Sequence, residues 1–239
     1  MNHRFLRYAA WAAEYFFPTG CLICGASLLG KTESFLPVCS SCLTRLKAGR
    51  RRGSCCAVCG TPLTSEEGLC LRCRERSFTF HSHRSLYDYG GEIKTLLLAY
   101  KKGGYNALAR LFADLLGETL LQDYPDIPVV PVPARPAALR QRGFDTTGLI
   151  CCLLKKKYPV RVIPLLKRNN AKQQKTLKYA ERILNLQGKF RLKKAPPFSF
   201  DRVVLLDDVF TTGATAEACS TVLKAGGLSR VDVLTLSQD

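Results

Sequence analysis

Two adjacent carboxylates stand between an apolar run and a hydroxyl-rich turn. Val203–Leu206 predicts a buried strand, and Asp207 and Asp208 follow it directly. The next segment, Thr211–Thr215, offers hydroxyl and backbone N–H groups at the predicted beginning of a helix, where the helix dipole favours a dianionic phosphate. The carboxylates can accept hydrogen bonds from vicinal hydroxyls, directly or through Mg²⁺. Together these residue types indicate a site for a ribose phosphate.

Eight of the twelve cysteines form four Cys-x-x-Cys pairs. Such a pair can ligate one metal ion from a single turn, and two pairs complete a closed tetrahedral zinc site. We therefore predict two structural Zn²⁺ ions. Their ligands are Cys21, Cys24, Cys39, Cys42, Cys56, Cys59, Cys70 and Cys73. Sequential pairing, first four and last four, is the simplest arrangement, and cross-bracing of alternate pairs is also allowed.

The other cysteines have different roles in this interpretation. Cys55 could replace Cys56 only by giving up the two-residue spacing. Cys151, Cys152 and Cys219 are expected on apolar helix faces as small core residues. Thiolate pairs of this kind suit a reducing compartment, and we expect the protein in the cytoplasm.

Strands alternate with helices from about residue 83 onward. The predicted strands are His83–Tyr89, Ile127–Val132, Arg161–Leu166, Val203–Leu206 and Arg230–Leu236. The predicted helices are Glu92–Lys101, Asn106–Leu121, Asp145–Lys157 and one that ends at Lys224. This alternation predicts an α/β fold, a mainly parallel sheet with helices on both faces, preceded by a small cysteine-rich zinc-ribbon module. We place the helix at 1–20, the double ribbon at 21–76 and the α/β domain at 83–239.

The chain is strongly basic, and its first residues are amphipathic. The formal net charge is +17, which favours polyanionic partners such as nucleic acid, although a generally basic protein would show the same balance. Between the fourth and fifth of the predicted metal-ligating cysteines, the cations Arg45, Lys47 and Arg50–Arg52 form either a phosphate-binding patch or a solvated loop. Residues 1–20 have apolar residues at helical spacing and are expected to form an amphipathic helix that packs on the protein or touches a membrane surface. A signal peptide is not expected, because Glu14 interrupts the apolar run. No membrane span is expected.

The whole stretch 203–215 resembles the motif by which type I phosphoribosyltransferases bind 5-phosphoribosyl-1-pyrophosphate (PRPP). With the cysteine module, the resemblance narrows to the ComF family, competence-associated phosphoribosyltransferase-like proteins with an N-terminal double zinc ribbon. Supporting stretches are Tyr100–Gly104, Pro131–Arg135, Arg142–Phe144 and Gln174–Phe190. The PRPP-binding residues that the resemblance implies are Asp207, Asp208, Val209, Thr211, Thr212, Gly213, Ala214 and Thr215. The chain departs from the family pattern at Asp145, Thr146 and Ala171.

The resemblance also implies a pyrophosphate loop and a mobile hood. The loop consists of Val132, Pro133, Ala134 and Arg135, and the hood, within 168–185, offers Lys172, Gln174 and Arg182. In the implied reaction a nucleophile displaces pyrophosphate from C1 of the ribose. Mg²⁺ accompanies PRPP, Asp207 and Asp208 hold the ribose, and Arg135 or Lys101 offsets charge on the leaving group.

Three functions remain open at this point. The first is a phosphoribosyltransferase with an unknown acceptor. The second is a non-catalytic PRPP- or nucleotide-binding module that handles single-stranded DNA in natural transformation, with proteins of the competence machinery as candidate partners. The third is a zinc-ribbon regulator that senses PRPP.

Overall fold

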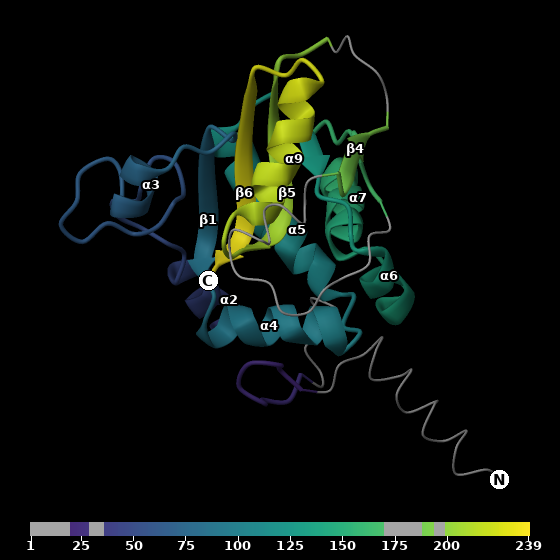
Figure 1. The fold of residues 1–239 in the computed structure, drawn as a ribbon. Helices are drawn as coiled ribbons and strands as arrows, with labels where there is room; N and C mark the ends of the chain where they lie inside the picture. Colours follow the sequence, from purple (N-terminus) through teal and green to yellow (C-terminus); the bar gives the residue numbers. More distant parts are fainter. Residues whose placement is uncertain (1–19, 29–35, 170–187, 194–198) are drawn as a thin grey trace.

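Four parallel strands form the central sheet of this computed structural model, which describes residues 20–28, 36–169, 188–193 and 199–239 (Figure 1). The strands are β1 (Ser82–Asp88), β2 (Val129–Pro131), β5 (Arg202–Phe210) and β6 (Arg230–Gln238). Their order across the sheet is β1-β6-β5-β2, and every adjacent pair is parallel. The carboxyl ends of all four strands therefore meet at one edge, where open α/β sheets bind ligands.

Helices cover both faces of this sheet, as the sequence predicts. They are α4 (Gly91–Lys102), α5 (Leu108–Asp123), α7 (Thr146–Lys157) and α9 (Ala214–Ala225). On β5, Val204 and Leu206 pack into one core with α4, α5 and α7. Val203 and Leu205 pack into a second core with α9. The apolar run of β5 is continuous because successive side chains point to opposite faces and both faces are buried.

A small antiparallel pair lies beside the main sheet. It consists of β3 (Leu166–Arg168) and β4 (Phe190–Leu192). The prediction of a strand at Arg161–Leu166 was wrong, because only Val162 makes a bridge to β2 and the strand begins at Leu166. Pro164 accounts for the break, since it has no N–H to donate. The predicted hood residues Lys172, Gln174 and Arg182 lie outside the described residues.

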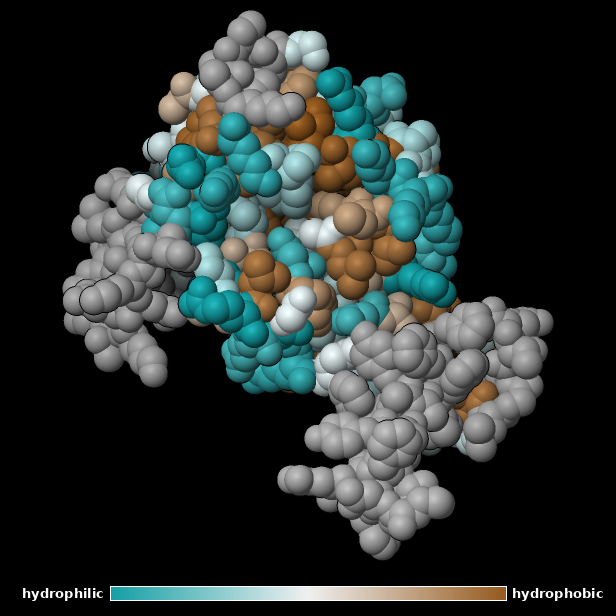
Figure 2. Space-filling model, turned by 90° about the vertical axis from the view of Figure 1, so that its right-hand side faces the viewer, coloured by the Kyte–Doolittle hydropathy of each residue, from teal (hydrophilic) through white to brown (hydrophobic). Residues whose placement is uncertain are grey.

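A short helix that the sequence analysis did not predict follows β2. This helix, α6 (Pro136–Arg142), begins with proline at its first turn and ends at Gly143 in the left-handed conformation. None of its residues is buried, and Leu139 is 43% exposed. Figure 2 views the side of the molecule that carries α6 in Figure 1, and its apolar areas are broken up by hydrophilic side chains.

The cysteine module contains two similar turns, each followed by a short helix. The helices are α2 (Ser40–Ala48) and α3 (Leu71–Glu75), and each begins directly after a cysteine. Gly25 and Gly60, which follow the second cysteine of their pairs, have φ of 73° and 68°. These left-handed positions explain why glycine closes each turn.

The predicted N-terminal helix falls almost wholly on residues 1–19, outside the described part of the chain. In that described part, no helix is both long enough and apolar enough to cross a membrane.

Candidate functional site

The two adjacent carboxylates lie within β5, near its carboxyl end. The apolar run predicted a strand that ends at Leu206, but β5 continues to Phe210 because its pairing with β6 extends to Gln238. Since neighbouring residues of a strand point to opposite faces, the two acids serve different surroundings. Asp207 lines a pocket on the α9 side, and Asp208 pairs with a lysine of α4 on the other side.

Asp208 forms an ion pair with Lys101, one of the predicted catalytic residues. The Lys101 Nζ lies 2.7 Å from Oδ1 of Asp208, and both side chains are mostly buried. The Thr146 hydroxyl lies 3.5 Å from the other carboxylate oxygen, and the carbonyl of Thr146 accepts a 2.8 Å hydrogen bond from the Tyr100 hydroxyl. Thr146 is thus a neighbour of the site that the sequence analysis noted only as a departure from the family pattern.

The carboxyl group of Asp207 ionises at a higher pH than an ordinary aspartate. Burial, together with the neighbouring charge of Asp208, raises the pKa of Asp207 from 3.8 to about 7. The backbone N–H of Asp208 donates to Oδ1 of Asp207 at 2.9 Å, which partly offsets the loss of solvation. A carboxyl group with a pKa near neutrality in a pocket is typical of a functional site.

The loop after β5 forms the other wall of this pocket. Gly213 caps α9 with φ of 77°, and its carbonyl accepts from the Glu217 N–H at 2.8 Å, which starts the helix. The Thr212 hydroxyl accepts from the Ala214 N–H at 3.4 Å. This arrangement directs backbone donors and the positive end of the helix dipole toward the carboxyl edge of the sheet.

A shallow pocket at this edge brings most of the predicted PRPP-binding residues together. The predicted residues that line it are Asp207, Val209, Thr211, Gly213, Ala214 and Thr215, with Val132 from the pyrophosphate loop. Asp208 and Thr212 are not part of the lining, and neither are Pro133, Ala134 and Arg135. Asp208 is directed to Lys101 instead, while Arg135 is the residue directly before α6. Residues that the sequence analysis did not assign to the site also line the pocket, among them Val233 and Thr235 of β6.

Arg135 of the predicted pyrophosphate loop lies close to two other cations, Arg168 and Lys189. Burial and the charge of Arg135 lower the pKa of Arg168, and burial with the charges of Arg168 and Arg135 lowers the pKa of Lys189. Among the described residues, no carboxylate lies within ion-pair distance of Arg135, Arg168 or Lys189. Arg168 and Lys189 flank the predicted hood, so their position could have drawn attention to them. Mutual repulsion in such a cluster is relieved by an anion.

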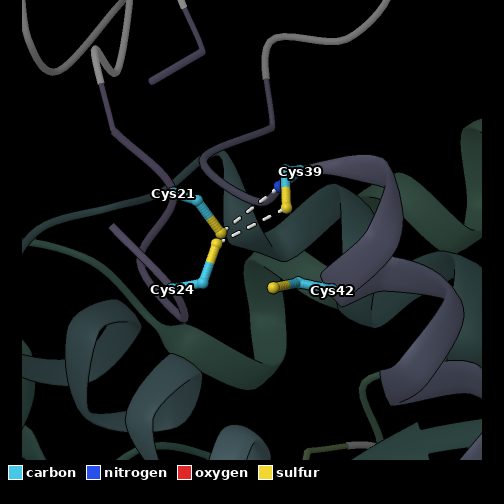
Figure 3. A group of neighbouring side chains, drawn as sticks. All are labelled: Cys21, Cys24, Cys39 and Cys42. Atoms are coloured by element: carbon cyan, nitrogen blue, oxygen red, sulfur yellow. Dashed lines mark hydrogen bonds between the residues drawn. The ribbon is translucent and has the colours of Figure 1, made fainter. Parts of the chain in front are cut away.

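The eight predicted metal ligands form two groups of four, paired sequentially. In each group the four sulfur atoms lie within 4.8 Å of one another. Figure 3 shows the first group, in which Cys21, Cys24, Cys39 and Cys42 converge. The sulfurs of Cys24 and Cys39 are 3.7 Å apart, close to the separation of about 3.8 Å that tetrahedral Zn–S bonds of about 2.3 Å require. The cross-braced alternative is thereby excluded.

The electrostatics of the thiols also fit a divalent cation. A hydrogen bond with the Ser41 hydroxyl lowers the pKa of Cys39 to about 6, while burial raises the pKa of Cys42 to about 12. Four crowded thiolates repel one another, and a bound cation lets them all ionise. The molecule therefore has two closed tetra-cysteine zinc-binding sites, and Cys55 belongs to neither.

The remaining cysteines agree only in part with the prediction. Cys151 on α7 and Cys219 on α9 are buried core residues. Cys152 is exposed, because it follows Cys151 on a helix and so points about 100° away from the buried face. Its assignment to an apolar face was wrong.

The basic run of the cysteine module serves to dock the module onto the α/β domain. Arg50 donates to Glu118 of α5 at 2.7 Å, and Arg51 pairs with Asp88 at the end of β1. Arg51 also donates to the side chain of Gln238 at 2.6 Å, and its side chain is only 11% exposed. Arg50 and Arg51 are therefore neither a free phosphate-binding patch nor a solvated loop, and both predictions were wrong for these two residues.

The architecture thus defines an α/β protein with a parallel sheet and two tetra-cysteine zinc ribbons. A family model for the double zinc ribbon domain matches residues 12–74. The chain is 32% identical over 209 residues to the competence protein ComFC of Bacillus subtilis, covering 83% of each chain. It is also 26% identical over 230 residues to the DNA utilization protein YhgH of Salmonella typhimurium, covering 92% of this chain and 96% of the relative. The chain belongs to the ComF family.

Solved structures add a more distant likeness. The chain is similar to a hypoxanthine phosphoribosyltransferase from Staphylococcus aureus, with a TM-score of 0.33 and 15% identity. The match covers 56% of this chain and 65% of that one.

Proposed function

We propose that this protein binds PRPP with Mg²⁺ and transfers its phosphoribosyl group to an acceptor. The observation that carries the proposal is the convergence of Asp207 and the loop Thr211–Thr215 on one pocket. A carboxylate acceptor on one side and a helix amino end on the other match the two ends of a ribose 5-phosphate. The proposal places the protein in the cytoplasm, where its thiolates stay reduced.

Each group of the site has a role in this reaction. The loop Thr211–Thr215 holds the 5-phosphate, and Asp207 accepts hydrogen bonds from the ribose hydroxyls, while Asp208 holds Lys101 at the same edge of the sheet. Bound Mg²⁺ would offset charge on the pyrophosphate. Arg135 and the adjacent Arg168 face the same negative charge. The acceptor nucleophile forms a bond to C1 of the ribose while the bond from C1 to the pyrophosphate oxygen breaks, and the pyrophosphate leaves with both electrons of that bond.

Pyrophosphate release tests turnover. Zinc-loaded protein, PRPP and Mg²⁺ are incubated with a panel of nucleobases, nucleosides and single-stranded oligonucleotides. We expect one class of acceptor to produce pyrophosphate in proportion to enzyme, and Arg135→Ala to reduce this rate at least tenfold because an electrostatic contact to the leaving group is lost. Arg140→Ala, which removes an exposed cation from the next turn of α6, is the matched control. Equal rates for the two variants would contradict the role of Arg135.

A second function is favoured by the net charge of +17 and by the names of the relatives, which are a competence protein and a DNA utilization protein. In this role the protein handles single-stranded DNA during DNA uptake. Its affinity for an oligonucleotide should then fall steeply between low and moderate salt, since each neutralised phosphate releases a counterion. Charge reversal tests this best at exposed Arg52, because Arg50 and Arg51 hold the two parts of the molecule together. Salt-independent binding would count against this role.

A further inference from the structure

The second zinc ribbon, residues 55–76, touches the proposed phosphate loop directly. The side chain of Arg72, on α3 between two zinc ligands, donates a 2.7 Å hydrogen bond to the carbonyl of Thr212. Thr212 lies in the middle of the loop that joins β5 to α9. A residue 140 positions earlier in the chain thus anchors the backbone of this loop.

A stack of rings makes a second connection between the ribbon and the loop. The His83 ring lies 2.8 Å from the carbonyl of Cys59, to which its Nδ1 donates. The same ring stacks on Phe210, with 3.8 Å between ring centroids and 13° between planes. Phe210 in turn packs against Gly213 so closely that an added Cβ would lie 2.8 Å from the ring. The zinc turn, the ring pair and the capping glycine therefore form one continuous contact.

A third connection holds the first turn of α9. Glu217 accepts hydrogen bonds from the backbone N–H and the hydroxyl of Thr79, at 2.8 Å and 2.5 Å. Thr79 belongs to the short link between the second ribbon and β1. The Glu217 N–H donates to the Gly213 carbonyl at 2.8 Å, so this clamp reaches the same loop.

The first ribbon makes no such connection among the described residues. Its ion pairs are directed to other helices: Arg45 pairs with Glu92 of α4, and Lys47 pairs with Glu118 of α5. The two zinc ribbons therefore differ in what they support, although each is built from two Cys-x-x-Cys pairs.

We infer that the second ribbon is a structural part of the phosphate site, with Arg72 as a positioning residue for its loop. This inference rests on the proposed function. In a planar trans peptide the carbonyl and the following N–H point in opposite directions. When Arg72 fixes the Thr212 carbonyl, it fixes the direction of the Gly213 N–H, and Gly213 lines the pocket. The loop is thereby prepared to bind phosphate before the ligand arrives.

Two variants on the same helix test this role. Arg72→Ala removes the anchor, whereas Arg74→Ala removes an equal charge whose hydrogen bonds go to carbonyls of its own ribbon, Leu69 and Glu67. We expect faster amide hydrogen exchange in residues 209–217 of free Arg72→Ala, with the Arg74→Ala variant like the wild type. Both variants should keep two zinc ions per chain. PRPP affinity, measured by calorimetry, should fall roughly fivefold to tenfold in Arg72→Ala only, as the loss of one solvent-exposed hydrogen bond of ordinary net strength predicts.

A conservative change separates positioning from bulk structure. Arg72→Lys keeps a charged donor at this position and should restore most of the protection in residues 209–217. Exchange in Arg72→Ala no faster than in Arg74→Ala, or an Arg72→Lys variant as unprotected as the alanine variant, would overturn the inference. If the wild type fails to bind PRPP at all, the proposed function fails, and the exchange measurement still decides whether the ribbon positions the loop.

Discussion

Replacing Asp207 by asparagine should stabilise the folded protein at alkaline pH, although it removes a residue of the proposed site. The folded state raises the pKa of Asp207 from 3.8 to about 7. Between these two values the folded state binds more protons than the unfolded state, so the stability of the wild type falls as pH rises. This destabilisation of the wild type is absent below the pKa of Asp207 in the unfolded state and complete above its pKa in the folded state. Asparagine carries no charge at any pH and still offers Oδ1 to the Asp208 N–H.

The size of this effect follows from the pKa. One pKa unit corresponds to about 1.4 kcal/mol, so the wild type should lose about 2 kcal/mol relative to Asp207→Asn between about pH 5.5 and pH 7, with little further change at pH 8. Urea denaturation of both proteins at pH 5.5 and pH 8, followed by circular dichroism, measures the difference. A variant whose advantage is the same at both pH values, or that is less stable than the wild type at pH 8, would refute the assignment of a reluctantly ionised Asp207.

Other substitutions probe the neighbours of Asp207. Asp208→Asn should lower the free energy of unfolding by about 1–3 kcal/mol, because it leaves Lys101 mostly buried without its partner. In urea denaturation at pH 8 this variant should therefore be less stable than the wild type, whereas Asp207→Asn should be more stable. Gly213→Ala should cost about 1–3 kcal/mol through its left-handed backbone and its contact with Phe210, whereas Gly90→Ala, at an extended N-cap position where nothing lies within 4 Å of the new carbon, should cost less in the same assay. A strong zinc chelator should increase hydrogen exchange in residues 21–73 first, since closed zinc sites supply the folding energy of small modules. Uniform exchange across both parts of the chain would contradict that expectation.

Local chemical signals in the sequence were enough to predict the zinc ligands and the position of the paired acids near the carboxyl end of a buried strand. The spacing of Cys56 and Cys59 indicates one turn around a metal, and Gly60 indicates the left-handed residue that closes it. Likewise, the apolar run before Asp207 requires a buried strand, and the threonines after it require a helix beginning. These features depend on residues close together in the chain, so they can be predicted from the residue pattern and spacing alone.

Contacts between residues far apart in the chain could not be predicted from such local patterns. Lys101 was selected by resemblance, but its pairing with Asp208 depends on how α4 crosses the end of β5. The length of β5 depends on its pairing with β6, which no property of the run before Asp207 reveals. Helix α6 is different, since Pro136 is a local signal for a helix beginning that the sequence analysis did not use.

The docking of the zinc ribbons illustrates the same limit. Arg50 and Arg51 have the composition of a nucleic-acid patch, and only the fold reveals that carboxylates of the α/β domain face them. Arg72 stands in a run of alternating arginines that resembles any exposed basic segment. Its contact with Thr212 arises because the second ribbon folds back on the carboxyl edge of the sheet.

Calorimetric titration with PRPP and Mg²⁺ tests the central claim most directly. The wild-type protein, loaded with zinc, is compared with the double variant Asp207→Asn, Asp208→Asn, whose zinc content and circular dichroism are checked first. We predict saturable binding of one PRPP per chain to the wild type and at least a hundredfold weaker binding to the double variant, since a loss of about 2.8 kcal/mol corresponds to a factor of a hundred. Wild-type protein that releases no heat with PRPP and gains no thermal stability from it, or a double variant that binds PRPP as tightly as the wild type, would contradict the assignment of this pocket.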